Sequence, residues 1–315
     1  MIHEVALSAK SSSGPGRERL LRTALLGNAA FSATTGAAMT LFPNAVAGLA
    51  GIDVPVALRV LGLGLLAFAG VVAWTGIRNR LRAWLAVLIS FADLLWVAGS
   101  AVLVLVSPPF MHAGSARPVL LVAFAVLGFG VLQLLGVRRL LRETSPHLGA
   151  WRHCLSVNVD APPDAMWRVV SDLGAISRFV PTLVNSALVD DVAPREGAVR
   201  VCADTSGRQW EEVCTAFEPR ARRLRLRFRT EADNFPYPMK EMHGGWKVEP
   251  HGEGSRVMVW WSMTPTLSMV PWLLVALMGR RLDKAFPTVI ERMAAHAGGR
   301  PVEPTSRRSL SVAPC

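Results

Sequence analysis

Apolar residues in the first half of the chain form four long runs separated by short polar breaks. The runs cover residues 20–42, 56–77, 83–106 and 118–137. Each is close to the about 20 residues that a helix needs to cross a hydrocarbon core of about 30 Å. The breaks hold proline, glycine, asparagine and charged residues, which end helices. The pattern predicts an all-α bundle of four transmembrane helices over residues 20–142, joined by short loops.

From residue 151 the long runs give way to short alternating segments. Seven of them read as strands: "HCLSVNV", "NSALVDD", "GAVRVCADT", "QWEEVCTAFEP", "RRLRLRFRT", "PMKEMHGGWKVEP" and "SRVMVWWSMTP". Between the first two lies "APPDAMWRVVSDLGAISRFV", which begins with proline and an acid and predicts two short helices. A long helix is predicted over residues 267–297, bent or broken at Pro287. This order predicts an α+β domain over residues 151–298, in which a curved antiparallel sheet wraps around the C-terminal helix and leaves a cavity.

The remaining segments are polar. Residues 1–19 are rich in serine and glycine and lack the short apolar core of a signal peptide, so we expect a disordered tail there. Residues 143–150 are expected to link the two domains, and residues 299–315 to form a second disordered tail.

Lysine and arginine gather at alternate ends of the apolar runs, which predicts the orientation. One side carries Lys10, Arg17, Arg19, Arg22, Arg78, Arg80, Arg82, Arg138, Arg139 and Arg142. The opposite side carries only Arg59 and Arg117. We therefore expect a multi-pass protein of a bacterial inner cell membrane with both termini in the cytoplasm.

Composition supports a membrane location and narrows the chemistry. Hydrophobic residues make up 51% of the chain, charged residues 18%, and the mean hydropathy is +0.34, which is too apolar for an ordinary soluble protein. Four cysteines without CxxC spacing favour a reducing compartment. The seven histidines show no metal-ligand spacing, so no metal is predicted. No phosphate-binding loop is present either, and no cofactor is predicted.

The element order of residues 151–298 resembles a known family. Together with "APPDAMWRVVSD" and "GGWKVEPHGEGSRVMVW" it is similar to the START/Bet v 1-like (SRPBCC) superfamily, in particular its polyketide cyclase/dehydrase and lipid transport branch. The resemblance implies a helix-grip fold that holds an apolar small molecule or lipid. It does not imply one chemistry, because the fold hosts cyclases, hydratases, carriers and sensors.

The segment "RARRLRLRFRT" raises the question of nucleic-acid binding, since the formal net charge is +11. Its arginines alternate with Leu224, Leu226 and Phe228, which predicts a half-buried strand. No aromatic residue on the basic face could stack on bases, so we do not expect nucleic acid as a partner. Two alternatives stay open for the ladder, a solvated strand face or a docking face for an anionic lipid leaflet, and both concern Arg223, Arg225, Arg227 and Arg229.

Strand alternation also predicts the residues that line the cavity. These are Phe179, Val199, Val201, Leu226, Phe228, Met242, Trp246 and Trp261. Glu211, Glu241 and His243 are weak catalytic candidates at the rim, since a register slip of one residue moves each of them to solvent. The apolar wall therefore disfavours an enzyme.

Asp93 lies near the middle of the third apolar run, where an unpaired carboxylate costs at least about 2.5 kcal/mol. We expect it to pair with Arg59 or to be protonated; a proton or substrate relay is the alternative, with Asn28 and Gln133 as the other polar residues. "GLGLLA" at Gly62 matches a dinucleotide fingerprint by letters, but it lies inside an apolar helix with no preceding strand, so we exclude it.

The expected function is a membrane-anchored cytoplasmic protein that binds or transfers a hydrophobic ligand or lipid, with the lipid bilayer and an apolar small molecule as partners. One alternative is a polyketide cyclase/dehydratase-like enzyme acting on an apolar substrate. The other is a transporter-like membrane bundle with a regulatory ligand-binding domain.

Overall fold

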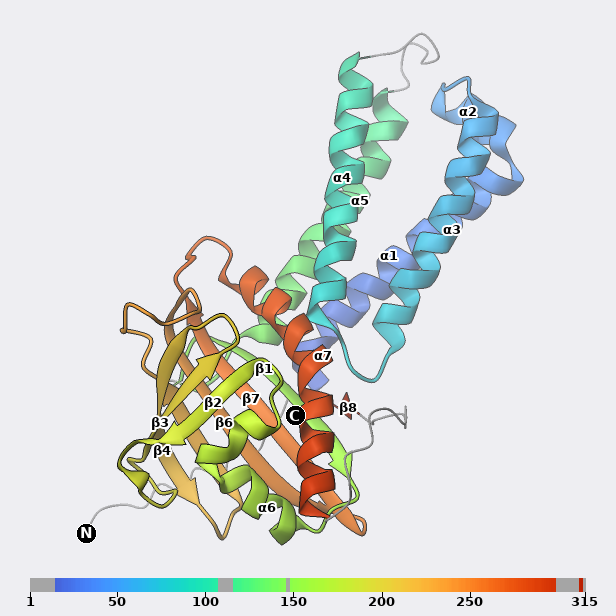
Figure 1. The fold of residues 1–315 in the computed structure, drawn as a ribbon. Helices are drawn as coiled ribbons and strands as arrows, with labels where there is room; N and C mark the ends of the chain where they lie inside the picture. The colour runs from blue at the N-terminus through green and yellow to red at the C-terminus, as the bar shows by residue number, and fades with distance from the viewer. Residues whose placement is uncertain (1–14, 107–115, 146–147, 299–311, 314–315) are drawn as a thin grey trace, which may run out of the picture. The chain divides into compact units, whose positions relative to one another are not determined.

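The computed structural model describes residues 15–106, 116–145, 148–298 and 312–313. The chain forms two compact units, a helical one over Ser13–Leu140 and a second one that holds Leu141–Cys315 (Figure 1). Most of the two predicted tails lies outside the described residues. The described parts differ from the expectation, because a helix already begins at Pro15 and residues 312–313 form a short strand.

The helical unit contains α1 (Pro15–Leu41), α2 (Pro43–Ala50), α3 (Pro55–Ile77), α4 (Ala83–Val106) and α5 (Ala116–Leu141). Among the described helices, α3, α4 and α5 are long and apolar enough to cross a membrane. The predicted count of four spans is therefore not confirmed. The first apolar run lies in α1, which carries Asn28, Ser32 and several threonines and glycines. The segment predicted as the first loop contains the short helix α2.

Small residues bring the helices of this unit close together. A Cβ at Gly62 of α3 would lie 2.7 Å from the carbonyl oxygen of Gly36 in α1. A Cβ at Gly136 of α5 would lie 2.8 Å from the Cα of Leu21 in α1. Glycines at such crossings let two backbones approach directly. The "GLGLLA" segment thus serves helix packing.

The second unit is built on an antiparallel sheet. Its strands are β1 (Trp151–Val159), β2 (Leu183–Leu188), β3 (Val199–Asp204), β4 (Gln209–Glu218), β5 (Arg223–Phe228), β6 (Met239–His251), β7 (Gly254–Pro265) and β8 (Val312–Ala313). They lie in the order β2-β3-β4-β5-β6-β7-β1-β8, with every pair antiparallel. Strands β2 to β7 follow one another as a meander, so the chain returns beside the strand with which it started.

Three helical segments complete this unit: α6 (Pro163–Ser171), the 3-10 helix η1 (Leu173–Arg178) and α7 (Pro271–Ala297). The first two connect β1 to β2 at the opposite end of the strand order. Helix α7 packs on β1, β7 and α6 (Figure 1). It continues through Pro287 as one helix, so of the predicted bend or break the break is absent. An antiparallel sheet gripping a long C-terminal helix is the predicted helix-grip arrangement.

Contacts with α7 identify the inner face of the sheet. Phe286 of α7 has its ring 6.0 Å from that of Trp246 and 4.5 Å from that of Trp261. Cross-strand partners share a face, so the pairing of Trp246 with Leu224 places the apolar row of β5 inside. Leu224 and Leu226 are 0% and 2% exposed, as the alternation of that segment predicts.

The alternation of β3 was predicted in the wrong phase. Phe228 pairs with Glu212, and Glu212 pairs with Arg200, so Arg200 lies on the inner face and its neighbours Val199 and Val201 on the outer face. The two valines are therefore not part of the cavity wall. Apolar alternation gives the wrong phase because Arg200 and Cys202, not the two valines, occupy the inward positions of this strand.

The cysteines differ in state. Cys202 and Cys214 are free and buried on the inner face of the sheet. Cys154 of β1 is disulfide-bonded. The disulfide at Cys154 differs from the expectation of a reducing compartment.

Candidate functional site

Apolar side chains cover the inner face of the sheet opposite α7. Trp246 and Trp261 are each 6% exposed, and both rings contact Phe286 of the helix. The predicted lining residues Leu226, Phe228 and Met242 are buried in the same unit. These side chains pack against α7, and none of the five lines either of the two pockets described below, so their predicted role as ligand contacts stays a prediction.

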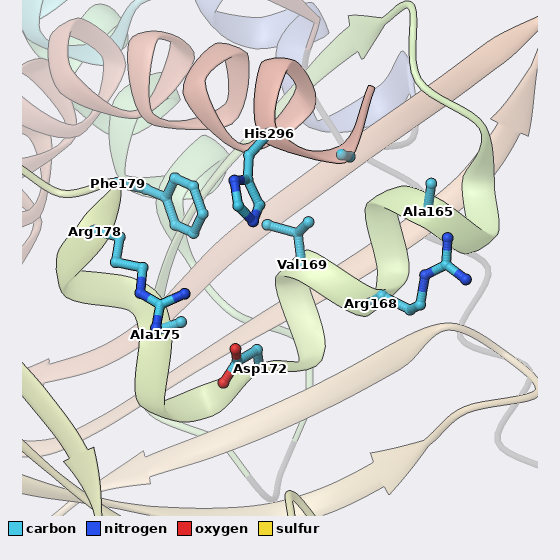
Figure 2. Close-up of a pocket in the computed structure, with 9 residues that line it drawn as sticks. Ala165, Arg168, Val169, Asp172, Ala175, Arg178, Phe179 and His296 are labelled. Carbon is cyan, nitrogen blue, oxygen red and sulfur yellow. The ribbon is translucent and has the colours of Figure 1, made fainter. Parts of the chain in front are cut away.

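A pocket of about 270 Å³ opens where α6, η1 and the C-terminal end of α7 meet (Figure 2). Its apolar side is formed by Ala165, Val169, Ala175, Phe179 and Ala297. The rings of Phe179 and His296 lie 5.6 Å apart in an edge-to-face arrangement. Figure 2 shows these two rings next to each other with Val169 close by. Phe179 is thus the one predicted ligand contact that lines this pocket.

Ionisable side chains also line the pocket. Arg168 of α6, Arg178 of η1 and His296 of α7 lie there with the carboxylate of Asp172. All four are exposed. Two arginines against one carboxylate give the rim a net positive charge, which favours a ligand with an anionic group.

The interior of the sheet contains an ion pair that strand alternation did not predict. Arg200 Nη2 lies 2.6 Å from Glu212 Oε2, and the Arg200 Nε lies 3.0 Å from the same oxygen. The indole N–H of Trp210 donates to Glu212 Oε1 at 2.8 Å, and Arg200 also donates to the Leu173 carbonyl of η1 at 3.2 Å. The pair is buried, so these bonds hold β3, β4 and η1 together in a region of low dielectric.

Thiols beside this pair are held in the neutral form. Burial and, after it, the negative charge of Glu212 raise the pKa of Cys202 to about 12. Burial also raises the pKa of Cys214. Neither cysteine is therefore suited to act as a nucleophile.

A histidine–carboxylate dyad joins the sheet to α7. His153 Nε2 lies 2.9 Å from Asp283 Oδ1, and the imidazole stacks on Trp261 with a centroid distance of 6.3 Å. A Cβ on Gly279 would lie 2.7 Å from His153 Nδ1, so the glycine leaves room for the ring. A carboxylate that orients an imidazole is a common arrangement for general acid–base chemistry.

The three predicted catalytic candidates lie on the other face. Glu211 forms an ion pair with Arg229, and Glu241 Oε1 lies 3.0 Å from His243 Nε2. Cross-strand pairing places Glu211 beside Val201 and His243 beside Arg227, on the outer side of the sheet. The structure therefore brings none of them to the surface that faces α7.

Carboxylates accompany most of the arginine ladder. Arg223 pairs with Glu218 and Arg227 with Glu231, each at 2.6 Å, and Arg229 pairs with Glu211. These partners neutralise three of the four charges, which favours the solvated strand face over a lipid-docking face.

Asp93 of the helical unit has amide partners in place of the predicted arginine. Its Oδ2 accepts hydrogen bonds from Asn28 Nδ2 at 2.9 Å and from Gln133 Nε2 at 3.2 Å. Asp93 is 3% exposed, whereas Arg59 is exposed, and the structure shows no ion pair between them. The sequence identified Asn28 and Gln133 as polar residues of the apolar runs, but it did not predict that they donate hydrogen bonds to Asp93.

Comparison with known proteins identifies the second unit. Residues 153–298 match the family model described as polyketide cyclase / dehydrase and lipid transport. Residues 153–298, slightly less than half of the chain, thus resemble this family. The helix-grip fold of this domain agrees with the resemblance to the SRPBCC superfamily. The three apolar helices precede this domain in the sequence.

Several solved structures are similar to about half of the chain. The aromatase/cyclase ZhuI from Streptomyces sp. R1128 is 15% identical, with 48% of this chain and 98% of that chain covered and a TM-score of 0.39. A Thermobifida fusca protein is 20% identical, with 49% and 99% covered and a TM-score of 0.39. The di-domain ARO/CYC protein BexL is 20% identical, with 47% and 46% covered and a TM-score of 0.37. No curated protein matches the chain.

Two groups of the polyketide cyclase/dehydrase domain escaped the sequence analysis. The inward orientation of Glu212 could have been predicted from the sequence. Trp210 and Cys214 lie two residues before and after it in β4, so all three side chains share one face of the strand. The His153–Asp283 dyad could not, since 130 residues separate its members and only the packing of α7 on β1 joins them.

Proposed function

We propose that the chain is a membrane-anchored protein whose polyketide cyclase/dehydrase domain binds an amphiphile with an apolar body and an anionic group. The pocket between α6, η1 and α7 carries this proposal, because it combines Phe179 and Val169 with a positively charged rim. The ligand's acidic group would lie near Arg168 and Arg178, and its apolar part against Phe179 and Val169.

The apolar helices support the membrane part of the proposal. Helices α3, α4 and α5 are long and apolar enough to span a bilayer. The arginine distribution along the sequence favours a cytoplasmic location for the domain. An anchor of this kind keeps the domain near the membrane in which a sparingly soluble ligand is concentrated.

Photolabelling of the full-length chain tests the proposal. The purified protein in dodecylmaltoside is irradiated with a diazirine-bearing fatty acid, and the labelled peptides of residues 151–298 are mapped by mass spectrometry. We expect adducts in α6, η1 and the end of α7. Val169→Trp fills the pocket and should lower this labelling at least about fivefold, whereas Val184→Trp, at an exposed position of β2, should not. Adducts only in the helical unit would overturn the proposal.

An enzyme remains the second candidate, and the His153–Asp283 dyad is the observation that favours it. The dyad lies on the sheet face that meets α7, beside Trp261. Asp283 would orient the imidazole, and His153 would move the proton in a cyclisation or dehydration.

A model substrate distinguishes this candidate from a binding protein. The full-length chain is incubated with a β-hydroxyketone thioester, and loss of water is followed by ultraviolet absorbance. Catalysis that His153→Gln removes and Glu241→Gln retains would support the enzyme. Equal rates with wild-type protein and with buffer would exclude dehydration of this substrate class.

A further inference from the structure

A second cleft lies within the helical unit. A cleft of about 220 Å³ is bounded by four helices, α1, α3, α4 and α5, and most of its lining is apolar. Phe31 and Phe68 contribute aromatic rings to it, and Leu61, Gly64 and Ala92 are exposed where they border it. The cleft is thus accessible from the side of the bundle, which a molecule dissolved in the bilayer could use.

The two carboxylate oxygens of Asp93 in this cleft differ in their hydrogen bonds. Asp93 lines it, and both amide donors, Asn28 and Gln133, bind the same carboxylate oxygen, Oδ2. No side chain among the described residues donates a hydrogen bond to Oδ1. In the part of the chain that the structure describes, no cationic side chain pairs with this carboxylate either. An ionised carboxylate in such a place requires a positive partner.

Trp96 lines the same cleft one helical turn after Asp93. Its indole N–H is buried and has no hydrogen-bond partner among the described residues. A buried indole N–H normally finds an acceptor, because leaving it unpaired costs free energy. The hydroxyl of Ser32, another lining residue, already donates to Asn28 Oδ1 at 3.1 Å.

The geometry points to a site for a compact lipophilic ammonium compound that also carries an oxygen acceptor. Its cationic group would pair with Asp93, the rings of Phe31, Phe68 and Trp96 would favour the cation, and its oxygen would accept from the Trp96 N–H. The volume is below the about 300–1,000 Å³ typical of sites for drug-sized ligands, which limits the ligand to a small molecule. This site is independent of the proposed ligand of the polyketide cyclase/dehydrase domain, so each proposal can fail alone.

Choline phenyl ether is a suitable probe, because it joins a trimethylammonium group, an ether oxygen and an aromatic ring. Its binding to the full-length protein in dodecylmaltoside is measured with tritiated compound. We expect saturable binding at one site per chain. The neutral carbon analogue, 3,3-dimethylbutyl phenyl ether, should compete at least about tenfold more weakly, since it lacks the charge.

Two pairs of variants separate the site from general effects on folding. Asp93→Asn should weaken probe binding at least about tenfold, while Asp53→Asn, at an exposed carboxylate of the same unit, should leave it unchanged. Gly64→Leu keeps Asp93 and places a side chain in the cleft, where a Cβ meets nothing within 4 Å. It should abolish binding, whereas Gly70→Leu in the same helix, with equally open surroundings, should not.

Three results would overturn the inference. These are the absence of saturable binding, equal affinity for the neutral analogue, and unchanged affinity in both Asp93→Asn and Gly64→Leu. Equal affinity for the neutral analogue would indicate that the cleft takes an uncharged lipid-like molecule.

Discussion

Arg200 and Glu212 form a buried ion pair across two neighbouring strands of the sheet, with 2.6 Å between Nη2 and Oε2. The side chains are 8% and 3% exposed, so solvent screens them little. Hydrogen bonds from Trp210 and to the Leu173 carbonyl satisfy further polar atoms of the pair. Each charge is therefore accommodated only while the other is present.

Removing one member of this pair should destabilise the domain more than removing both. Glu212→Leu leaves Arg200 buried without a counter-charge and should lower the unfolding free energy by about 3–5 kcal/mol. The double variant Arg200→Met/Glu212→Leu should recover much of this loss, because no buried charge remains. Urea unfolding of the full-length protein in detergent, followed by tryptophan fluorescence, measures both. A double variant as unstable as the single one would show that the pair is not the source of the effect.

Cys202 should resist alkylation in the folded protein. Raising its pKa from 9.0 to about 12 lowers the thiolate fraction at pH 8 by about a thousandfold, and burial adds to the protection. Maleimide labelling followed by mass spectrometry should modify Cys202 only after the chain is unfolded in urea. Glu212→Gln removes a negative neighbour and should speed the labelling. Equally fast labelling of folded and unfolded wild-type protein would contradict the prediction.

The element order and the family resemblance could be predicted from the sequence because they follow from local patterns. Apolar runs, turn residues and strand alternation give helices α3 to α5 and strands β1 to β7. The inward side of β5 was also predictable, because Leu224, Leu226 and Phe228 all differ in polarity from the arginines between them.

The inward face of β3 and the partners of Asp93 were less predictable, since single polar residues determine both. In β3 the valines indicated the wrong face, because Arg200 and Cys202 take the inward positions and Glu212 of β4 provides the counter-charge for Arg200 there. For Asp93 the sequence predicts either a pair with Arg59 or a protonated acid. Its partners come instead from α1 and α5, whose contact with α4 no local pattern encodes.

Asp204 should make the turn between β3 and β4 sensitive to acid. Its carboxylate accepts hydrogen bonds from the Ser206 hydroxyl and from Arg208, which lower its pKa to about 2. A depressed pKa in the folded state contributes stability above the ordinary value of 3.8 that is lost as the pH falls toward 2. Asp204→Asn should therefore lower the thermal midpoint at pH 7, and the gap to wild type should shrink at pH values below about 4.

Differential scanning fluorimetry over this pH range measures the gap. Asp233→Asn is the matched control, because Asp233 is exposed and its carboxylate forms no ion pair within the described part of the chain. This variant should show no gap at either end of the range. A gap for Asp204→Asn that stays constant from pH 7 to pH 3 would argue against the turn as its origin.

Gly62 and Gly70 of α3 should respond in opposite ways to the same substitution. Alanine in place of glycine favours a helix by about 1 kcal/mol, so Gly70→Ala, where a Cβ meets nothing within 4 Å, should be neutral or stabilising. A Cβ at Gly62 would lie 2.6 Å from Thr40 Oγ1 and 2.7 Å from the Gly36 carbonyl oxygen. Because the Gly36 oxygen belongs to the backbone of α1, the two helices must move apart, at a cost of about 1–3 kcal/mol. The thermal midpoint of the full-length protein in dodecylmaltoside, measured by loss of the monodisperse gel-filtration peak, should fall for Gly62→Ala alone. Equal thermal midpoints for the two variants would show that the packing of α1 on α3 does not depend on this close approach.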